Sequence, residues 1–439
     1  MRRTVPLLLL LCAAVAGAAE TNPPAETKTL AECVALALER HPSIHVSDAD
    51  LAAGRARVWQ AGSGYLPQVS GTWSSNRSQS SFSSRTGGPT TGAASTVTAR
   101  ETVFNFHQGS VGLTQTLFDF GQTLAAIRAA QARRDSLAAD VDTTRAAVVL
   151  GVKQAYFGLL AARRLLAVAD ETVRNDQKQL ELARGRNEVG FAPRLDVTRS
   201  EVQLASAELD RLTARNAVSV AEVTLANALG LEGPLGFDIV DVLASPRVSL
   251  DESAALDRAY EQRPELRSLE AQVRAGEQDV AERKRSLLPT VRADANYGGS
   301  GSEAPLSENW SFGAVVDVPI FDGGLTWARI GESNANLIGL RSQEQQLRQQ
   351  VALEVRRAVL DVARAAESIA VTERGVAQAR ENLALAEGRY QTGVGNVIEL
   401  TDAQTTKASA DADHVRALYD HQTAIATLEQ AIAQELPSP

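Results

Sequence analysis

Residues 117–121 read Leu-Phe-Asp-Phe-Gly, and residues 320–324 read Ile-Phe-Asp-Gly-Gly. The two stretches lie 203 residues apart, and the same spacing relates further positions downstream of them. A repeat of this length is not a solenoid module of roughly 20–50 residues. We therefore expect a duplicated half-molecule, with a first repeat over 20–240 and a second over 241–439.

Matched residues also lie upstream of this motif, at a spacing of 222 residues. Pro42 recurs as Pro264, and the Leu-Pro pair at 66–67 recurs at 288–289. Both halves also begin with a Ser/Thr-x-x-Glu sequence, in which two side chains satisfy reciprocal backbone donors at a helix start. These two predicted capped starts are Thr29 to Glu32 and Ser249 to Glu252.

The first 19 residues have the order of a secretory signal peptide. Arg2 and Arg3 precede an apolar run over 5–15 and a group of small residues at 16–19. Cys12 would suit a lipoprotein, but it follows a leucine instead of a small residue, so we interpret it as part of the leader. After cleavage Cys33 is the remaining cysteine, and no disulfide can form within the mature chain.

Charge and hydrophobicity narrow the class of protein. The formal net charge is -9, and loss of the two leader arginines lowers it by two units, to -11, which argues against a nucleic-acid partner. Beyond the leader we find no run of 18 apolar residues. Any membrane-spanning part must then be closed β structure, because lipid tolerates only helices and barrels.

Two proline-free segments, about 121–188 and 325–391, are rich in Ala, Leu, Arg, Gln and Glu and predict very long helices. A helix of 67 residues spans roughly 100 Å. Each ends at a glycine turn and is followed by a second helix, over 194–230 or 397–434. Such helices must bury a stripe against neighbours. We expect this packing seam at Ala155, Leu159, Ala162, Leu166, Ala358, Val362 and Ala365.

Four segments, 67–76, 103–118, 289–298 and 309–320, have strand periodicity. Apolar and polar residues alternate in them, as is typical of outer-membrane barrel strands. Segments 74–100 and 298–308 predict solvated loops. A half-buried soluble hairpin would explain one such strand, but four at matching positions in an exported chain favour a barrel. Trp73 and Trp310 suit an aromatic girdle or ordinary packing.

One chain supplies four strands, whereas the smallest transmembrane barrels have about eight. Four strands cannot close, so we expect an obligate oligomer. The alternative is a soluble periplasmic coiled-coil adaptor or scaffold, which would share export and long helices. Such a protein needs no amphipathic membrane strands, and the four alternating segments therefore favour the membrane protein.

The chain resembles the TolC-type outer membrane efflux channel family in its paired halves, Leu-Pro strand starts, Phe-Asp strand-to-helix transitions and glycine turns. The resemblance implies an internally duplicated α+β membrane protein that forms a homotrimer. A twelve-strand β-barrel in the outer membrane would continue as a twelve-helix tunnel through the periplasm. Helix 45–63 would stack end to end with 194–230, and helix 265–286 with 397–434.

The implied function is a passive exit channel in a tripartite efflux or type I secretion system. An inner-membrane pump would supply the energy through a periplasmic membrane-fusion adaptor, and the protein would perform no chemistry. In the family the adaptor docks at the periplasmic tip, where the glycine turns lie. The glycines also serve as ordinary helix C-caps. The matching adaptor-contact positions are Val189, Gly190, Phe191, Thr392, Gly393 and Val394.

Glu399 and Asp402 match acidic residues that line the closed tunnel end in the family. Their i,i+3 spacing places them on one helix face, where three chains would form a ring that attracts cations. A solvated acidic helix face is the alternative. The first half has Asp196 and Arg199 at these positions, so the repeats differ where a pore constriction is expected.

Tyr390 matches a family tyrosine that holds the tip closed through an inter-helix bond to the equivalent of Asp196. The family's representative has an arginine at the position of Gly395, so part of that closing network is missing here.

We find no sequence pattern of an enzyme or a cofactor site. His41 and His45, and likewise His414 and His421, form pairs without the additional ligands of a metal site. The sequence contains no P-loop, dinucleotide motif or Ser/His/Asp pattern.

Overall fold

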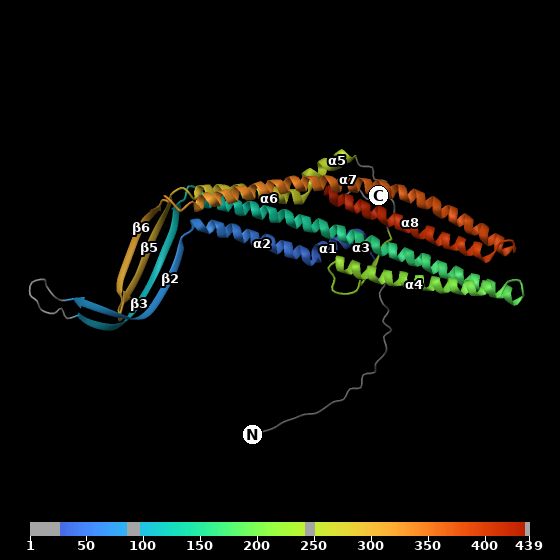
Figure 1. Cartoon of the computed structure of the whole chain (residues 1–439), viewed down its shortest axis with the longest axis horizontal. Coiled ribbons are helices and arrows are strands. Elements are labelled where there is room, and N and C mark those ends of the chain that lie inside the picture. The colour runs from blue at the N-terminus through green and yellow to red at the C-terminus, as the bar shows by residue number, and fades with distance from the viewer. Residues whose placement is uncertain (1–26, 86–96, 242–250, 435–439) are drawn as a thin grey trace, which may run out of the picture.

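The computed structural model describes residues 27–85, 97–241 and 251–434. The molecule is elongated, with a β-sheet at one end and a bundle of long helices along the rest of its length (Figure 1). The expected signal peptide over 1–19 and the cap residue Ser249 lie outside the described residues.

In the first repeat the helices are α1 (Leu30–Arg40), α2 (Pro42–Gly62), α3 (Gln122–Glu188) and α4 (Arg194–Ala228), with a short 3-10 turn η1 at Ser63–Tyr65. The predicted cap at the start of α1 is confirmed, because the Thr29 side chain accepts from the Glu32 amide and Glu32 accepts from the Thr29 amide. His41 separates α1 from α2, and its Nδ1 accepts from the Ser43 amide.

In the second repeat the helices are α5 (Glu252–Gln262), α6 (Pro264–Arg285), α7 (Leu325–Gln391) and α8 (Val397–Ile432). The cap predicted for α5 is wrong. Asp251 is the N-cap residue and makes no capping bond. Glu252 is the first helical residue, too early to reach back to a cap, and it pairs with Arg356 of α7 at 3.0 Å.

The sheet is antiparallel in the order β2-β3-β5-β6, with β2 at Gln68–Arg85, β3 at Val97–Phe118, β5 at Thr290–Gly301 and β6 at Ser307–Asp317. The four predicted strands are present, but the predicted loops are too long. Continuous pairing reaches Arg85 opposite Val97, so most of 74–100 is strand. Strand formation depends strongly on context, and here the adjacent partner strand outweighs the loop-like composition. β6 ends before the predicted residue 320. A separate parallel pair joins β1 (Thr27–Lys28) to β4 (Asp238–Ile239).

The sheet separates apolar from polar side chains. Ala295 lies opposite Phe312 and Leu113, and Tyr297 lies opposite Trp310, on one face of the sheet. On the other face the Thr114 hydroxyl donates to Asp294 at 3.1 Å. The alternation predicted from the sequence is therefore a two-sided sheet with an exposed apolar face.

The Phe-Asp motif connects each strand pair to its long helix. Asp119 accepts hydrogen bonds from the Thr123 amide at 2.6 Å and the Tyr65 hydroxyl at 2.8 Å. Burial raises the pKa of Asp119, but these bonds outweigh burial and hold the pKa below its ordinary value. Asp322 accepts from the Thr326 amide at 2.8 Å in the second half. The aspartate thus satisfies the open amides at the start of α3 and of α7.

Helix packing builds the rest of the molecule. α3 packs on α2 and α4 and also on α6 and α8, whereas α7 packs on α6 and α8. In Figure 1 α2 and α4 follow one another along α3, and α6 and α8 follow one another along α7, as the resemblance implies. The predicted seam is buried at six of its positions, and Leu166 is half-buried.

The cores lie at mid-length, around Tyr156 and Leu225 in the first repeat and around Val355 and Leu428 in the second. One stretch of α3 has mean hydropathy 1.2 over 18 residues, long and apolar enough for a membrane span by composition. Of that stretch 44% is buried inside the chain, so its apolar residues serve helix packing.

Candidate channel entrance at the helical tip

The turn between α3 and α4 ends the first helical hairpin. Gly190 has φ +77°, a left-handed conformation that favours glycine. The Phe191 amide donates to the Arg186 carbonyl at 2.8 Å, and the Gly190 amide donates to the Asn187 carbonyl at 3.0 Å. Phe191 is 88% exposed and Val189 is 67% exposed. The turn therefore presents two apolar side chains to its surroundings.

The turn between α7 and α8 has the same backbone. Gly393 has φ +78°, and the Val394 amide donates to the Arg389 carbonyl at 3.0 Å. The Thr392 hydroxyl donates to the Gly388 carbonyl at 3.0 Å. Val394 is 74% exposed. The predicted glycine turns are therefore both present, at the same end of the molecule (Figure 1).

Gly395 occupies a confined position after the second turn. A Cβ at this position would lie 3.0 Å from the Arg389 Cβ and 3.1 Å from the Tyr390 amide nitrogen. The backbone therefore leaves little room for a side chain at Gly395, the position where the family's representative has an arginine.

Tyr390 does not make the expected bond to Asp196. Its side chain is 4% exposed and packs with Leu383, Val397 and Leu400. Its hydroxyl oxygen has no hydrogen-bond partner among the described residues. The prediction of this bond is wrong, because the side chain packs into the apolar cluster of the α7–α8 hairpin and its hydroxyl makes no bond to α4.

The two predicted acidic residues of α8 differ in their pairing. The Glu399 carboxylate lies 3.0 Å from the Arg389 Nε, so a cation of the same hairpin compensates its charge. Asp402 is exposed and has no ion pair within the described part of the chain. On α4, Asp196 is half-buried and Arg199 is exposed, and no ion pair joins them there. Of the two predicted acids of α8, Asp402 is therefore the unpaired one.

Sequence reasoning missed two arginines at the tip. Arg389 pairs with Glu399, and Arg186 of α3 reaches across to α7, where its guanidinium carbon lies 4.3 Å from the centroid of the Tyr390 ring. The duplication could have indicated them, because Arg186 and Arg389 lie 203 residues apart and therefore occupy equivalent positions in the two repeats.

Comparison with known proteins identifies this architecture. The profile of the family described as outer membrane efflux protein matches residues 33–231 and 255–434. The chain belongs to the outer membrane efflux protein family.

Relatives of this efflux protein agree with that assignment. Outer membrane efflux protein BepC of Brucella suis is 25% identical over 423 residues, which cover 94% of this chain and 87% of BepC. Fusaric acid resistance protein FusA of Burkholderia cepacia is 30% identical over 241 residues, 52% of this chain and 45% of FusA. The CmeC outer membrane channel of Campylobacter jejuni has the same fold, with a TM-score of 0.79 and 17% identity, covering 97% of this chain and 94% of CmeC. The protein is an outer-membrane efflux channel.

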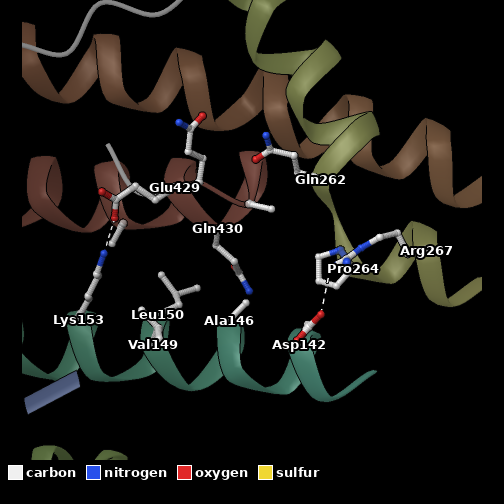
Figure 2. A pocket seen from close by; sticks show the side chains of 13 residues that line it. Asp142, Ala146, Val149, Leu150, Lys153, Gln262, Pro264, Arg267, Glu429 and Gln430 are labelled. Carbon is white, nitrogen blue, oxygen red and sulfur yellow. Dashed lines mark hydrogen bonds and ion pairs between the residues drawn. The ribbon is translucent and has the colours of Figure 1, made fainter. Parts of the chain in front are cut away.

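Elsewhere in this efflux protein, a cavity of about 270 Å³ lies between α3, the junction of α5 with α6, and the end of α8 (Figure 2). Lys153 of α3 pairs with Glu429 of α8 at 2.6 Å, and Arg267 of α6 pairs with Asp142 of α3 at 3.2 Å. Both pairs tie α3 to its neighbours where α8 ends and α6 begins, so we interpret this region as a structural joint.

The histidines have structural surroundings. His414 Nδ1 lies 3.1 Å from the Thr372 hydroxyl of α7, and burial lowers the pKa of His421. Among the residues that the structure describes, no group of three or more His, Cys, Asp or Glu side chains is arranged to hold a metal ion.

Proposed function

We propose that three copies of this chain close their sheets into one twelve-strand barrel in the outer membrane. The observation that carries this proposal is the four-strand sheet itself. Within the described residues β2 and β6 each pair along one edge only, and one face of the sheet is apolar and exposed. Open edges are not tolerated in lipid, so the sheet requires further copies for closure.

The same trimer would form the tunnel through the periplasm. α4 exposes Leu195, Val202 and Leu209 at intervals of seven residues, and α7 exposes Leu353 and Leu360 at the same interval. Seven-residue apolar spacing is the pattern of helices that pack along a shared seam. α3, α6 and α8 lie between α4 and α7, so the two exposed stripes suit neighbouring copies. Three chains would supply a twelve-helix wall.

The tip is the proposed docking site for a periplasmic adaptor, through which an inner-membrane pump would deliver substrate. Val189, Phe191 and Val394 are large apolar side chains exposed at hairpin ends, far from the sheet. Gly190, Thr392 and Gly393 complete the two contact loops. Exposed apolar groups of this kind mark interaction sites. Membership of the outer membrane efflux protein family agrees with a role in efflux.

The pore constriction would lie just above these turns. Asp402 from three chains would form a ring of unpaired carboxylates, whereas Glu399 is compensated by Arg389. Asp196 and Arg199 would contribute the corresponding positions of the first repeat. Such a ring attracts cations and repels anions. The protein would conduct passively, without a catalytic step, a cofactor or a nucleic-acid partner.

We further propose that the chain is made as a precursor with a signal peptide and two structural repeats. Residues 1–19 would be a signal peptide, and 20–240 and 241–439 the two structural repeats of an exported protein.

Reconstitution in planar lipid bilayers tests the channel. The wild type should be recovered with the outer membrane as a trimer and conduct ions. The double variant Asp402→Ala with Glu399→Ala should raise the conductance and weaken block by multivalent cations. Asp413→Ala, which changes an exposed acid further along α8, is the matched control. Unchanged block in the double variant would show that these acids do not line the constriction.

The sequence left a soluble coiled-coil adaptor open as the alternative, and membership of the outer membrane efflux protein family argues against it. The apolar face of the sheet disfavours it, since a periplasmic scaffold would expose that face to water. Recovery of the protein in the soluble periplasmic fraction would reject the channel and favour the adaptor.

A further inference from the structure

One row of the sheet has no side chains in its middle. In this row Gly109 of β3 lies between Trp73 of β2 and Gly299 of β5, and Gly299 lies opposite Glu308 of β6. The row is on the apolar face, because Gly299 follows Tyr297 by two residues and alternate strand residues point the same way. Two adjacent glycines therefore leave a gap between the side chains of the outer strands.

A shallow hollow of about 610 Å³ occupies this gap. Gly71, Gly109 and Gly299 line it together with the side chains of Tyr297 and Leu306. A Cβ at Gly299 would lie 3.1 Å from the Leu306 Cβ, so the lack of a side chain there keeps the hollow open. Ligand sites are typically concave and mostly apolar, with a few polar groups.

Trp73 forms one wall of the hollow. Its indole lies over Gly109, because a Cβ at that glycine would be 2.7 Å from an indole carbon. The His107 ring is stacked beside the indole, with the centroids 6.4 Å apart. Trp73 is nevertheless 68% exposed, and Tyr297 is 58% exposed. Both rings are therefore free to stack against a ligand.

Glu308 gives the hollow its polar end. Among the described residues that line the hollow it is the one with a charge, and its side chain is exposed. An ionised carboxylate only accepts hydrogen bonds. The group that binds next to it must therefore carry N–H or O–H donors.

The hollow lies at the outer end of the four-stranded part of the sheet. The pairing of β5 with β6 ends one residue beyond it, at Ser300 opposite Ser307, and the helices begin at the other end (Figure 1). Tyr297 and Trp310 form the adjacent row, and such residues lie at the headgroup level of membranes. With the helices in the periplasm, this end faces the outer leaflet, whose lipopolysaccharide carries an acylated and phosphorylated amino-sugar disaccharide, lipid A.

We propose that the hollow binds the lipid A part of one lipopolysaccharide molecule. A sugar ring stacks on Trp73, an acyl chain lies along Val111 and Tyr297, and amide or hydroxyl donors of the sugar bond to Glu308. The phosphates point away from Glu308, because like charges repel. The proposal rests on the barrel proposed above, since the hollow meets this lipid only if the sheet spans the outer membrane.

Filling the hollow is the first test. Gly71→Leu places a side chain in it, and the space around Gly71 is free, so the sheet should tolerate the change. Gly313→Leu is the matched control, because Gly313 also has free space but lies opposite Asp294 on the polar face. Native mass spectrometry of trimers titrated with lipid A should show binding about tenfold weaker in Gly71→Leu and unchanged in Gly313→Leu. Equal binding by the two variants would overturn the site.

Removing the wall is the second test. Trp73→Ala should weaken lipid A binding by about tenfold. Trp310→Ala is its control, because Trp310 is 78% exposed on the same face but does not line the hollow. Equal losses in the two variants would show a general affinity of the apolar face for lipid and overturn the site.

The headgroup contact has its own test. The wild type should bind phosphatidylethanolamine, which has no sugar ring, at least about tenfold more weakly than lipid A, and equal affinities would reject recognition of the sugar. Glu308→Leu should weaken lipid A binding by about tenfold, because the sugar donors lose their acceptor. Tighter binding in this variant would place the phosphates at Glu308 and overturn the proposed contact.

Conductance of the same trimers separates this proposal from the channel. Gly71 lies on the lipid face, so Gly71→Leu should conduct like the wild type. Weaker lipid A binding by Gly71→Leu in a protein that never conducts would uphold the site and reject the channel. A conducting trimer in which Gly71→Leu leaves lipid A binding unchanged would reject the site alone.

Discussion

The two hairpin tips share a backbone turn but differ in what surrounds it. The second tip buries Tyr390 in an apolar cluster and pairs Arg389 with Glu399. The Asn396 side chain accepts from the Glu399 amide at 2.8 Å and caps α8. At the first tip α4 starts at Pro193 without a side-chain cap, and Phe191 is exposed. One copy of the duplicated tip has been stabilised internally, and the other presents its apolar groups outward.

The hairpin interiors also differ, and again the second hairpin is the better packed. Asp176 of α3 is buried, and one of its carboxylate oxygens has no partner among the described residues. Ala379, 203 residues further on, is the equivalent position of α7 and is also buried. The first hairpin therefore carries a polar group in its core where the second carries a methyl group, which costs free energy of folding. The difference suggests that the first hairpin is the less stable of the two.

The largest loss of stability is expected from a substitution in the buried cluster of the second tip. Tyr390→Ala removes a buried aromatic side chain and should destabilise the α7–α8 hairpin by about 3 kcal/mol. Phe191→Ala, at the exposed first tip, should change stability by less than about 0.5 kcal/mol. Thermal unfolding followed by circular dichroism compares the two. Equal losses would show that the second tip is not the better packed.

The next effect concerns the buried acid. Burial raises the pKa of Asp176 from 3.8 to about 6. The folded chain therefore binds more protons than the unfolded chain between about pH 4 and 6, and the stability from the neutral carboxyl is lost as the pH rises through this range. Asp176→Asn should stabilise the protein by up to about 3 kcal/mol at pH 7, and this gain should shrink towards pH 4.

Melting temperatures at pH 4.5 and pH 7.5 check the Asp176 prediction. Glu181→Gln, an exposed change one turn further along α3, is the control and should show no such difference. A gain from Asp176→Asn that is the same at both pH values would contradict a titrating carboxyl.

A smaller effect, equal at both tips, is expected at the turn glycines. Gly190→Ala and Gly393→Ala should each cost about 1–2 kcal/mol, because a Cβ strains the left-handed conformation although space is free around it. Gly185→Ala, in the regular part of α3, should instead stabilise by up to about 1 kcal/mol. Unequal costs at the two turns, measured by thermal unfolding, would mean that the tips differ in backbone as well as in side chains.

Arg389→Gln is expected to change stability only slightly. The pair with Glu399 is exposed and should contribute less than about 1 kcal/mol. The variant nevertheless frees a carboxylate next to Asp402, so block by multivalent cations should strengthen. Single-channel recordings measure this block. Arg184→Gln, which breaks the pair of Arg184 with Glu201 on the first hairpin, serves as the control. Unchanged block would show that Glu399 faces away from the pore.

Much of the framework was predictable because its signals are local. The helix predicted over 325–391 coincides with α7, since glycines and prolines mark where a helix can begin and end. The Phe-Asp motif marked the strand-to-helix transitions for a similar reason, because Asp119 and Asp322 bond to amides within a few residues. The strands beyond residue 76 were missed, since their polar composition is shared by loops and only pairing with β3 distinguishes them.

The candidate site was predictable in part. Both glycine turns and the exposed Asp402 followed from sequence and resemblance. The contact of Arg186 with α7 did not, because its acceptor, the Gln391 carbonyl, is 205 residues away and no local pattern relates the two residues. The buried Asp176 had a usable signal, since it replaces an alanine of the other repeat at a helix-packing position.

The sequence by itself determined the duplication, the long helices and the presence of four strands in one chain. These properties depend on spacing, composition and the number of strands, which can be read along one chain. Only the tertiary structure decided which charges are paired, that the Tyr390 hydroxyl is unused, and that Arg186 rather than Asp196 reaches the second hairpin. Those outcomes depend on how helices that are distant in sequence are rotated and offset against one another. No local sequence pattern specifies that arrangement.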